Sequence, residues 1–131
     1  MNILLDSHAF LWFVSGNTAL SQPARNLIEN VEHRKFISLA TIWEISIKHS
    51  LGKLIIRGSF EGICDDVVQN GFEFLPITFH HLSCLNKLPF HHRDPFDRLL
   101  VAQAFIENLN IISADKFLDA YFEGTALRRL W

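Results

Sequence analysis

Short apolar segments alternate along this chain with longer segments in which apolar residues recur at helical spacing. Strands separated by helices favour a parallel sheet covered on both faces, so the predicted fold is a three-layer α/β/α domain with a central parallel sheet. The predicted strands are residues 2–5, 35–38, 72–77 and 111–113, with residues 126–131 as a closing edge strand. The predicted helices are a segment ending near residue 14, residues 20–31, 40–51, 59–69, 79–86 and 95–108, and a last helix starting near residue 116.

Length and composition limit the class of protein. A chain of 131 residues, 49% of them hydrophobic, is long enough for one core, and we expect a single domain over residues 1–131. We expect no membrane span and no secretory signal, because no apolar run is long enough and the N-terminus lacks a basic segment. Cys64 and Cys84 lie in apolar sequence without metal-type spacing, which predicts buried thiols in a reducing cytoplasm. The net charge of −2 argues against nucleic-acid binding through bulk positive charge.

Four acidic residues fall where predicted strands end or where the following helices begin. Asp6 ends the first strand, and Glu44 lies one turn into the helix after the second strand. Asp97 lies in the first turn of a helix opened by Pro95, and Asp115 closely follows the strand at 111–113. Because sites in open parallel sheets form at the carboxyl ends of the strands, we expect the four carboxylates near one cleft.

Each of these acids also has a structural interpretation. Asp94 followed by Pro95 is typical of a capped helix start, and Asp97 is favoured in the first turn by the helix dipole. One cause nevertheless explains all four acids together, namely a hard divalent cation such as Mg²⁺ or Mn²⁺, which prefers oxygen ligands. The remaining structural alternatives are a turn role for Asp6, an ion pair of Glu44 with Lys48, and a helix cap at Asp115.

Four blocks of sequence occur in the order LLDSHAFLW, SLATIWEISIKHSLGKL, LPFHHRDPFDRLLVAQA and IISADKFLDAY. Together they resemble the PIN domain family, and in particular its VapC-type toxin ribonucleases, over nearly the whole chain. The resemblance implies a compact α/β/α domain and a Mg²⁺- or Mn²⁺-dependent endoribonuclease. It also implies a small VapB-like antitoxin that blocks the site, and commonly a homodimer.

By this resemblance the four acids of the family fall on Asp6, Glu44, Asp97 and Asp115, which become the candidate catalytic and metal-binding residues. Metal ions held there would lower the pKa of a bound water and stabilise charge on the phosphate. We expect RNA hydrolysis that leaves a 5′-phosphate and a 3′-hydroxyl, because the 2′-hydroxyl is not needed as the nucleophile. Without these four acids the chain has ten acidic and twelve basic residues, which is compatible with an RNA substrate.

Five further residues are candidates for supporting roles. The small hydroxyl residues of the family match Ser7 and Ser113. Asp94 is interpreted as a helix cap or as a group just outside the metal ligands. Arg93 and Lys116 rank highest among the candidates for contact with RNA phosphate, because each neighbours a site acid.

Other interpretations remain open. The histidine pairs 80–81 and 91–92 lack the spacing of a zinc site, and the second pair could contact phosphate or pack the loop. A phosphohydrolase with Asp6 as a covalent nucleophile would usually have a second acid two residues later, where this chain has His8. A non-catalytic PIN-like domain that binds RNA or a protein is the remaining alternative, and the presence of all four acids argues against it.

Overall fold

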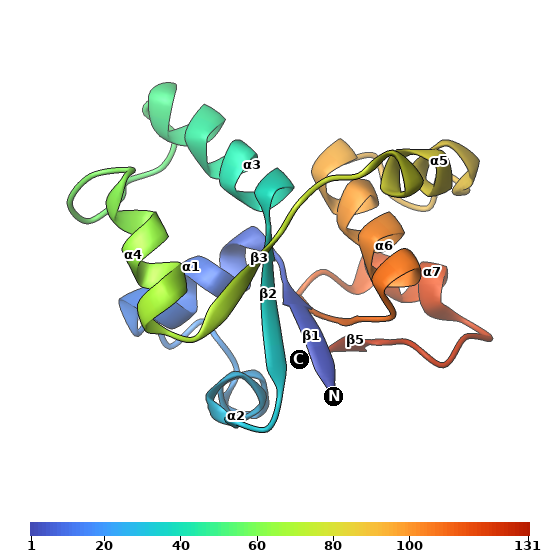
Figure 1. Ribbon diagram of the computed structural model, residues 1–131, viewed down its shortest axis with the longest axis horizontal. Helices are drawn as coiled ribbons and strands as arrows, with labels where there is room; N and C mark the ends of the chain where they lie inside the picture. The colour runs from blue at the N-terminus through green and yellow to red at the C-terminus, as the bar shows by residue number, and fades with distance from the viewer.

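The computed structural model describes residues 1–131 and contains one sheet of five parallel strands (Figure 1). The strands are β1 (Asn2–Leu5), β2 (Arg34–Ser38), β3 (Phe72–Leu75), β4 (Asn110–Ile112) and β5 (Arg129–Leu130). They lie in the order β3-β2-β1-β4-β5. The predicted α/β fold with a parallel sheet is confirmed, and the closing strand β5 is shorter than the predicted segment 126–131.

Seven α-helices and one 3₁₀ helix surround the sheet. In Figure 1, α1, α2 and α4 lie on one side of the sheet, while α6 and α7 lie on the other. Both α3 and α5 pack against α6. The helices are α1 (Ser7–Ser15), α2 (Gln22–Glu29), α3 (Leu39–Ser50), α4 (Gly62–Gln69), α5 (Phe79–Lys87), α6 (Pro95–Glu107) and α7 (Asp119–Phe122), with the 3₁₀ helix η1 (Lys116–Leu118).

The alternation of side chains along β1 produces two apolar cores. Ile3 and Leu5 belong to the core shared with α1, α2 and α4, whereas Leu4 belongs to the core shared with α6 and α7. All three side chains are fully buried, and each contributes roughly 1.5–3 kcal/mol to folding by its burial. Asp6, which follows β1 directly, therefore stands on a strand held from both faces.

Helix starts agree well with the polar residues predicted to cap them. The Ser21 hydroxyl accepts a hydrogen bond from the Ala24 N–H at 3.2 Å, as predicted for α2. Asp94 caps α6 in the same way, because its Oδ1 accepts the Phe96 N–H at 2.8 Å. The far end of α6 is closed by Asn108 in the left-handed conformation, with φ 57°.

Two helix predictions differ from the structure. The helix predicted at 59–69 begins at Gly62, because the preceding residues form a turn in which the Ser59 hydroxyl accepts the Gly62 N–H at 3.3 Å. The last helix is divided into η1 and α7, with Asp115 capping the first of them. Its predicted start at Lys116 is confirmed.

The prediction that both cysteines are buried is wrong. Cys64 is exposed and Cys84 is only half-buried. Cys64 misses the core because α4 buries Ile63 and Val67, which lie four residues apart on one face of the helix. None of the helices combines the length and the apolarity needed to cross a membrane.

Candidate metal centre

The candidate site lies at the carboxyl edge of the sheet, where the order of the strands reverses. The chain builds β2 and β3 on one side of β1 and then crosses to build β4 and β5 on the other side. This topology places the ends of β1 and β4 next to each other, and the Asp6 N–H donates to the Ile112 carbonyl at 3.2 Å. Such a reversal is where open α/β sheets bind ligands.

Asp6 is a buried carboxylate at the end of β1. Its Oδ1 accepts the Ala9 N–H at 2.9 Å and thereby caps α1. Burial raises the pKa of Asp6, and the side chain of Ser113 and the Ala9 N–H oppose that rise. The charge of Glu44 adds to it, so the ionised form of Asp6 would gain from a cation nearby.

Asp97 projects from the first turn of α6 into the same region. Burial raises its pKa to about 7, and the negative charges of Asp94, Asp6 and Glu44 push it in the same direction. The sum of these effects exceeds the opposing attraction of His92. Burial is thus the main cause of the raised pKa of Asp97, and three nearby acids, Asp94, Asp6 and Glu44, add to it.

Glu44 is buried on α3, and its position explains how the chain tolerates a carboxylate there. Lys48, one turn later, reaches back so that its Nζ lies 2.7 Å from Glu44 Oε2. This hydrogen bond raises the pKa of Lys48, and the charges of Asp94 and Asp97 raise it further. The structural alternative for Glu44, an ion pair with Lys48, is thus confirmed, and the pair lies within reach of the other acids.

Asp115 meets Asp97 through His92. The Nε2 atom of His92 lies 2.6 Å from Asp115 Oδ2 and 3.4 Å from Asp97 Oδ2. One ligand atom from each of these three residues lies within 4.8 Å of the other two. A carboxylate that follows β4 and one at the start of α6 are therefore adjacent, as the sequence predicted.

The hydrogen bonds of His92 fix which of its nitrogens carries the proton. Its Nδ1 accepts the Asp94 N–H at 3.0 Å, so the proton of a neutral ring is on Nε2. The Nε2–H then points at the carboxylates of Asp115 and Asp97 and offers no lone pair to a metal. His92 holds the acids in place, and the available metal ligands are oxygen atoms.

The two predicted hydroxyl residues differ in their contacts. Ser113 is fully buried, and its Oγ accepts the Asp115 N–H at 3.0 Å while its side chain lowers the pKa of Asp6. It therefore links the acids that follow β1 and β4. Ser7 is also buried, as the first residue of α1, but its hydroxyl forms no hydrogen bond within the protein.

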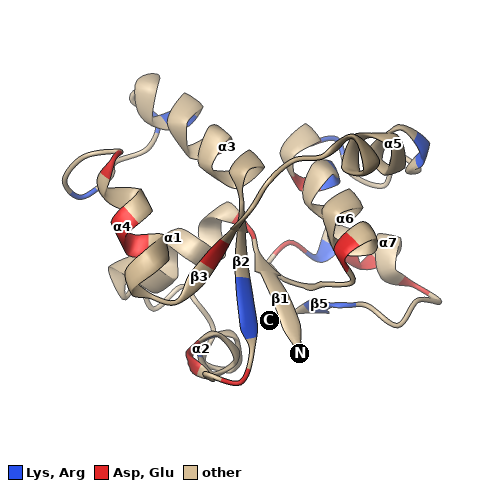
Figure 2. Ribbon diagram, viewed as in Figure 1, with Lys and Arg blue, Asp and Glu red and all other residues tan.

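The two basic residues predicted to contact RNA phosphate lie on the surface beside the site acids. Arg93 and Lys116 are exposed, and neither forms an ion pair. Lys48 is instead the basic residue that touches a site acid. Acidic residues also occur far from this edge, for example on α4 and β3, so sequence position alone does not identify the site (Figure 2).

His92 is the site residue that the sequence left undecided. From the sequence, His92 was predicted either to contact phosphate or to pack the loop. In the structure His92 contacts the carboxylates of Asp115 and Asp97. Its only signal was its place two residues before Asp94. In the other histidine pair, residues 80–81, the ring nitrogens of the buried His81 are engaged in hydrogen bonds with the Thr78 N–H and the Glu107 carboxylate.

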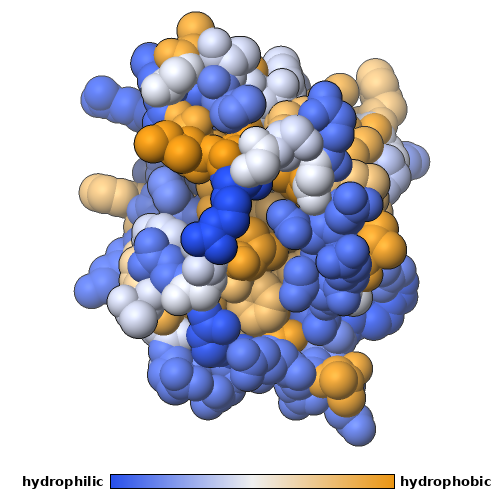
Figure 3. Space-filling view, turned by 90° about the vertical axis from the view of Figure 1, so that its left-hand side faces the viewer, coloured by the Kyte–Doolittle hydropathy of each residue, from blue (hydrophilic) through white to orange (hydrophobic).

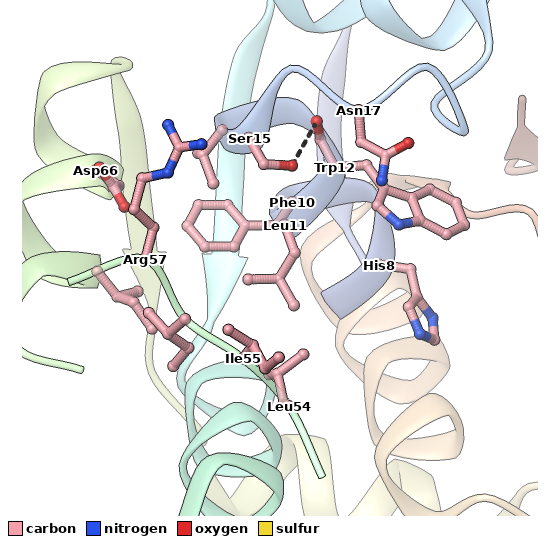
Figure 4. A pocket seen from close by; sticks show the side chains of 13 residues that line it. His8, Phe10, Leu11, Trp12, Ser15, Asn17, Leu54, Ile55, Arg57 and Asp66 are labelled. Carbon is pink, nitrogen blue, oxygen red and sulfur yellow. Dashed lines mark hydrogen bonds between the residues drawn. The ribbon is translucent and has the colours of Figure 1, made fainter. Parts of the chain in front are cut away.

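An apolar cavity of about 340 Å³ lies beside the site, between α1 and residues 54–57. Figure 3 shows apolar side chains gathered on the face that includes it. In Figure 4, Leu11 and Leu54 point into the cavity, and His8 and Trp12 stand at one end of it. His8 follows Asp6 by two residues, so an occupant of this cavity would approach the acids.

The donor set fits a hard divalent cation. Carboxylate oxygens of Asp97 and Asp115 lie together beside His92, and Asp6 and Glu44 are close enough for their charges to raise the pKa of Asp97. The basic groups that act on these acids are Lys48, His92 and His8. Mg²⁺ and Mn²⁺ bind such oxygen ligands and keep several water molecules. A cation here would relieve the repulsion that raises the pKa of Asp97.

Comparison with known proteins adds three structural neighbours. The sequence model of the PIN domain matches residues 3–122 of this chain. VapBC2 from Rickettsia felis, solved with a DNA fragment from its promoter, has 13% identity and a TM-score of 0.68, with 98% of each chain covered. A toxin–antitoxin complex from Klebsiella pneumoniae has 17% identity and a TM-score of 0.63, covering 96% of this chain and 94% of its own. FitAcB from Neisseria gonorrhoeae has 13% identity and a TM-score of 0.65, covering 98% and 96%.

These similarities concern the fold. At identities of 13–17%, the neighbours share the architecture of this chain and say nothing direct about its individual residues. No curated protein sequence matches the chain.

Proposed function

This chain belongs to the PIN domain family, and we propose that it is a metal-dependent endoribonuclease that hydrolyses RNA and acts as the toxin of a toxin–antitoxin pair. The observation that carries the proposal is the convergence of acids at the carboxyl edge of the sheet, where Asp97 and Asp115 lie together at His92 and the charges of Asp6 and Glu44 act on Asp97. A cluster of carboxylates this crowded is costly to the fold by itself. It is well explained by a site that holds a divalent cation.

In this proposal Asp6, Glu44, Asp97 and Asp115 hold Mg²⁺ or Mn²⁺. The bound cation would supply a water of lowered pKa and would stabilise negative charge on the phosphate. Of the four, Asp6 has the most fixed position, because β1 is buried on both faces and the carboxylate caps α1. The products would carry a 5′-phosphate and a 3′-hydroxyl.

The neighbouring residues orient these acids. His92 donates its Nε2–H to Asp115, and Ser113 joins the loop of Asp115 to the carboxylate of Asp6. Asp94 holds the first turn of α6, where Asp97 lies. Arg93 and Lys116 are proposed to contact RNA phosphates, and the buried Ser7 is proposed to support the site.

We propose a small VapB-like antitoxin as the protein partner and a homodimer as the assembly, acting in the cytoplasm. Support comes from structural neighbours that were solved as toxin–antitoxin complexes. The apolar cavity beside α1 offers a surface for an apolar segment of that partner, and its end at His8 lies close to Asp6. A basic side chain at the tip of such a segment could pair with the acids and block the metal.

The test is cleavage of an end-labelled mixed RNA pool by purified protein in Mg²⁺, in Mn²⁺ and in EDTA. Asp6→Asn should lower the rate more than about a hundredfold, because it replaces a proposed metal ligand while asparagine still caps α1. The matched control is Asp65→Asn, which changes an exposed acid on α4 and should cut normally. Cleavage in EDTA, or 2′,3′-cyclic phosphate ends, would contradict the proposal, and RNA binding without cleavage would favour a non-catalytic domain.

A further inference from the structure

A second cavity adjoins the metal centre at His92. It has a volume of about 290 Å³ and is lined by His91, His92, Arg93 and Phe117. This volume is close to the lower end of the range of about 300–1,000 Å³ found for small-ligand sites. The cavity is therefore suited to one small unit of a ligand and not to a helix.

Two residues that line this cavity, His92 and Phe117, form hydrogen bonds with the carboxylate of Asp115. Asp115 Oδ1 accepts the Phe117 N–H at 3.0 Å, and Asp115 Oδ2 lies 2.6 Å from His92 Nε2. The rings of His92 and Phe117 stand perpendicular, with centroids 6.2 Å apart. Because Asp115 holds both walls, a ligand in the cavity would lie directly beside the proposed metal.

The exposure of Phe117 has no explanation in the packing of the fold. Its side chain is 72% exposed, whereas its neighbours Leu118, Tyr121 and Phe122 fill the core beneath η1 and α7. Two unpaired cations lie near it, since Arg93 lines the same cavity and the adjacent Lys116 is exposed without an ion pair, while Asp119 is paired with Arg129 and Asp115 belongs to the metal centre. An exposed aromatic face flanked by unpaired cations is the combination that single-stranded nucleic acids require, with a base stacked on the ring and phosphates near the charges.

We propose that this cavity binds one nucleotide of single-stranded RNA, with its base stacked on Phe117 and its phosphate near Arg93, next to the bond that is cut. The inference rests on the proposed function for the choice of RNA. The charge of the surface favours RNA over the antitoxin here, because Arg93 and Lys116 would repel a basic segment that seeks the acids. The cavity beside α1, whose lining is mostly hydrophobic, is the better surface for a protein.

The test measures binding of a short fluorescent single-stranded RNA to protein carrying Asp6→Asn, so that no cutting is needed. Phe117→Ala should weaken binding about tenfold, because stacking on an aromatic ring is lost. Phe117→Trp should retain the affinity, and Phe117→Leu should behave like alanine because it keeps apolar area without a ring face. All three variants should keep the melting temperature, since the side chain is exposed.

A scan of abasic positions along the RNA then identifies the stacked base. One abasic position should weaken binding to the parent protein about tenfold and should cause no further loss in the Phe117→Ala variant. Arg93→Gln should weaken binding and reduce the slope of log K against log salt by about 0.7, the value for one phosphate contact on a single strand.

The outcomes separate this inference from the proposed function. If Phe117→Ala binds RNA as tightly as the parent, or if the abasic position costs the same in both proteins, the nucleotide site is wrong and the exposed ring belongs to a protein interface. If Phe117→Ala loses affinity as expected but protein that retains Asp6 cuts no RNA with Mg²⁺ or Mn²⁺, the nucleotide site stands and the nuclease proposal falls.

Discussion

At the scale of single residues, the site is defined by what its acids do to one another. Asp97 is the clearest case, because its carboxylate must be ionised to bind a metal and yet burial and like charges favour the protonated form. Within the chain, His92 opposes this effect at Asp97, and Lys48 pairs with the neighbouring Glu44. The affinity of the site for a cation should therefore depend strongly on pH.

The pKa of Asp97 predicts how stability changes with pH in the absence of metal. The folded protein holds the proton of Asp97 up to about pH 7, whereas the unfolded chain releases it near 3.8. The free energy of unfolding should therefore fall, by about 2–4 kcal/mol, as the pH rises through this window. Asp97→Asn cannot lose the proton, so its stability should fall less.

Urea denaturation in EDTA at about pH 5 and about pH 8 measures this difference. Because groups far from the site titrate equally in both proteins, the comparison between wild type and Asp97→Asn reports on Asp97 and on the neighbours that its charge affects. Identical pH dependence in the two proteins would show that Asp97 is not perturbed as described.

The sequence predicted which acids lie at the carboxyl edge of the sheet but not all their contacts. Asp6, Asp97 and Asp115 could be placed because strand ends and helix starts leave clear local patterns. His92 could not be assigned its role, because its contact with Asp115 joins two loops that are distant in the sequence. Loop conformation of that kind depends on tertiary packing and leaves no periodic signal.

At the scale of elements, the site depends on where helices begin. Asp6 caps α1, Asp94 caps α6 and Asp115 caps η1, so the same carboxyl-edge loops stabilise helices and collect charge. The structural and functional interpretations of these acids are therefore compatible. The positive end of each helix dipole also favours negative charge in this region.

Asp94 both caps α6 and places a negative charge near Asp97, and two substitutions of Asp94 separate these two effects. Asp94→Ala should destabilise the protein by about 1 kcal/mol, because the Phe96 and Asp97 N–H groups lose their acceptor. Asp94→Asn should keep most of that stability, since asparagine also caps helices, and should lower the pKa of Asp97 by removing a like charge.

Urea denaturation gives the stability, and an NMR titration of the carboxyl carbon of Asp97 gives its pKa. Equal destabilisation by alanine and asparagine would mean that the cap is not the main contribution of Asp94. An unchanged pKa in the asparagine variant would mean that the two acids do not interact.

Element positions were predicted better than element ends. The strands and the helix at 95–108 were located from apolar periodicity, and the largest error at a helix start came at Gly62. There the residues before the helix form a turn, in which the Gly62 N–H donates to the Ser59 hydroxyl. The amino-acid composition of this turn does not distinguish it from a helical turn. A local tertiary preference decided the boundary, as is usual for helix ends.

At the scale of the whole molecule, the C-terminal strand β5 closes the sheet against β4. Arg129 on β5 donates to the Ser113 carbonyl at 2.9 Å and pairs with Asp119 at 2.8 Å. This strand therefore supports the loop that carries Ser113 and Asp115, although it lies at the edge of the sheet. The order of the strands was not readable from the sequence, because register and crossover depend on contacts between distant segments.

Arg129→Met should destabilise the protein by about 1–3 kcal/mol, because a largely buried guanidinium loses a hydrogen bond to the main chain and an ion pair. Arg34→Met is the matched control, since Arg34 pairs with Glu73 on the exposed surface and its replacement should cost less stability than that of Arg129. Thermal denaturation of both variants measures the difference, and equal losses would show that β5 does not anchor the site.

The central claim is that the acids at the carboxyl edge of the sheet bind a divalent cation. The most direct test is a calorimetric titration of Mn²⁺ into the metal-free protein at about pH 8, where Asp97 is ionised. Wild type and Asp65→Asn should bind Mn²⁺ equally, and Asp97→Asn should bind it more than about tenfold more weakly. No binding to wild type, or equal binding to Asp97→Asn, would contradict the claim.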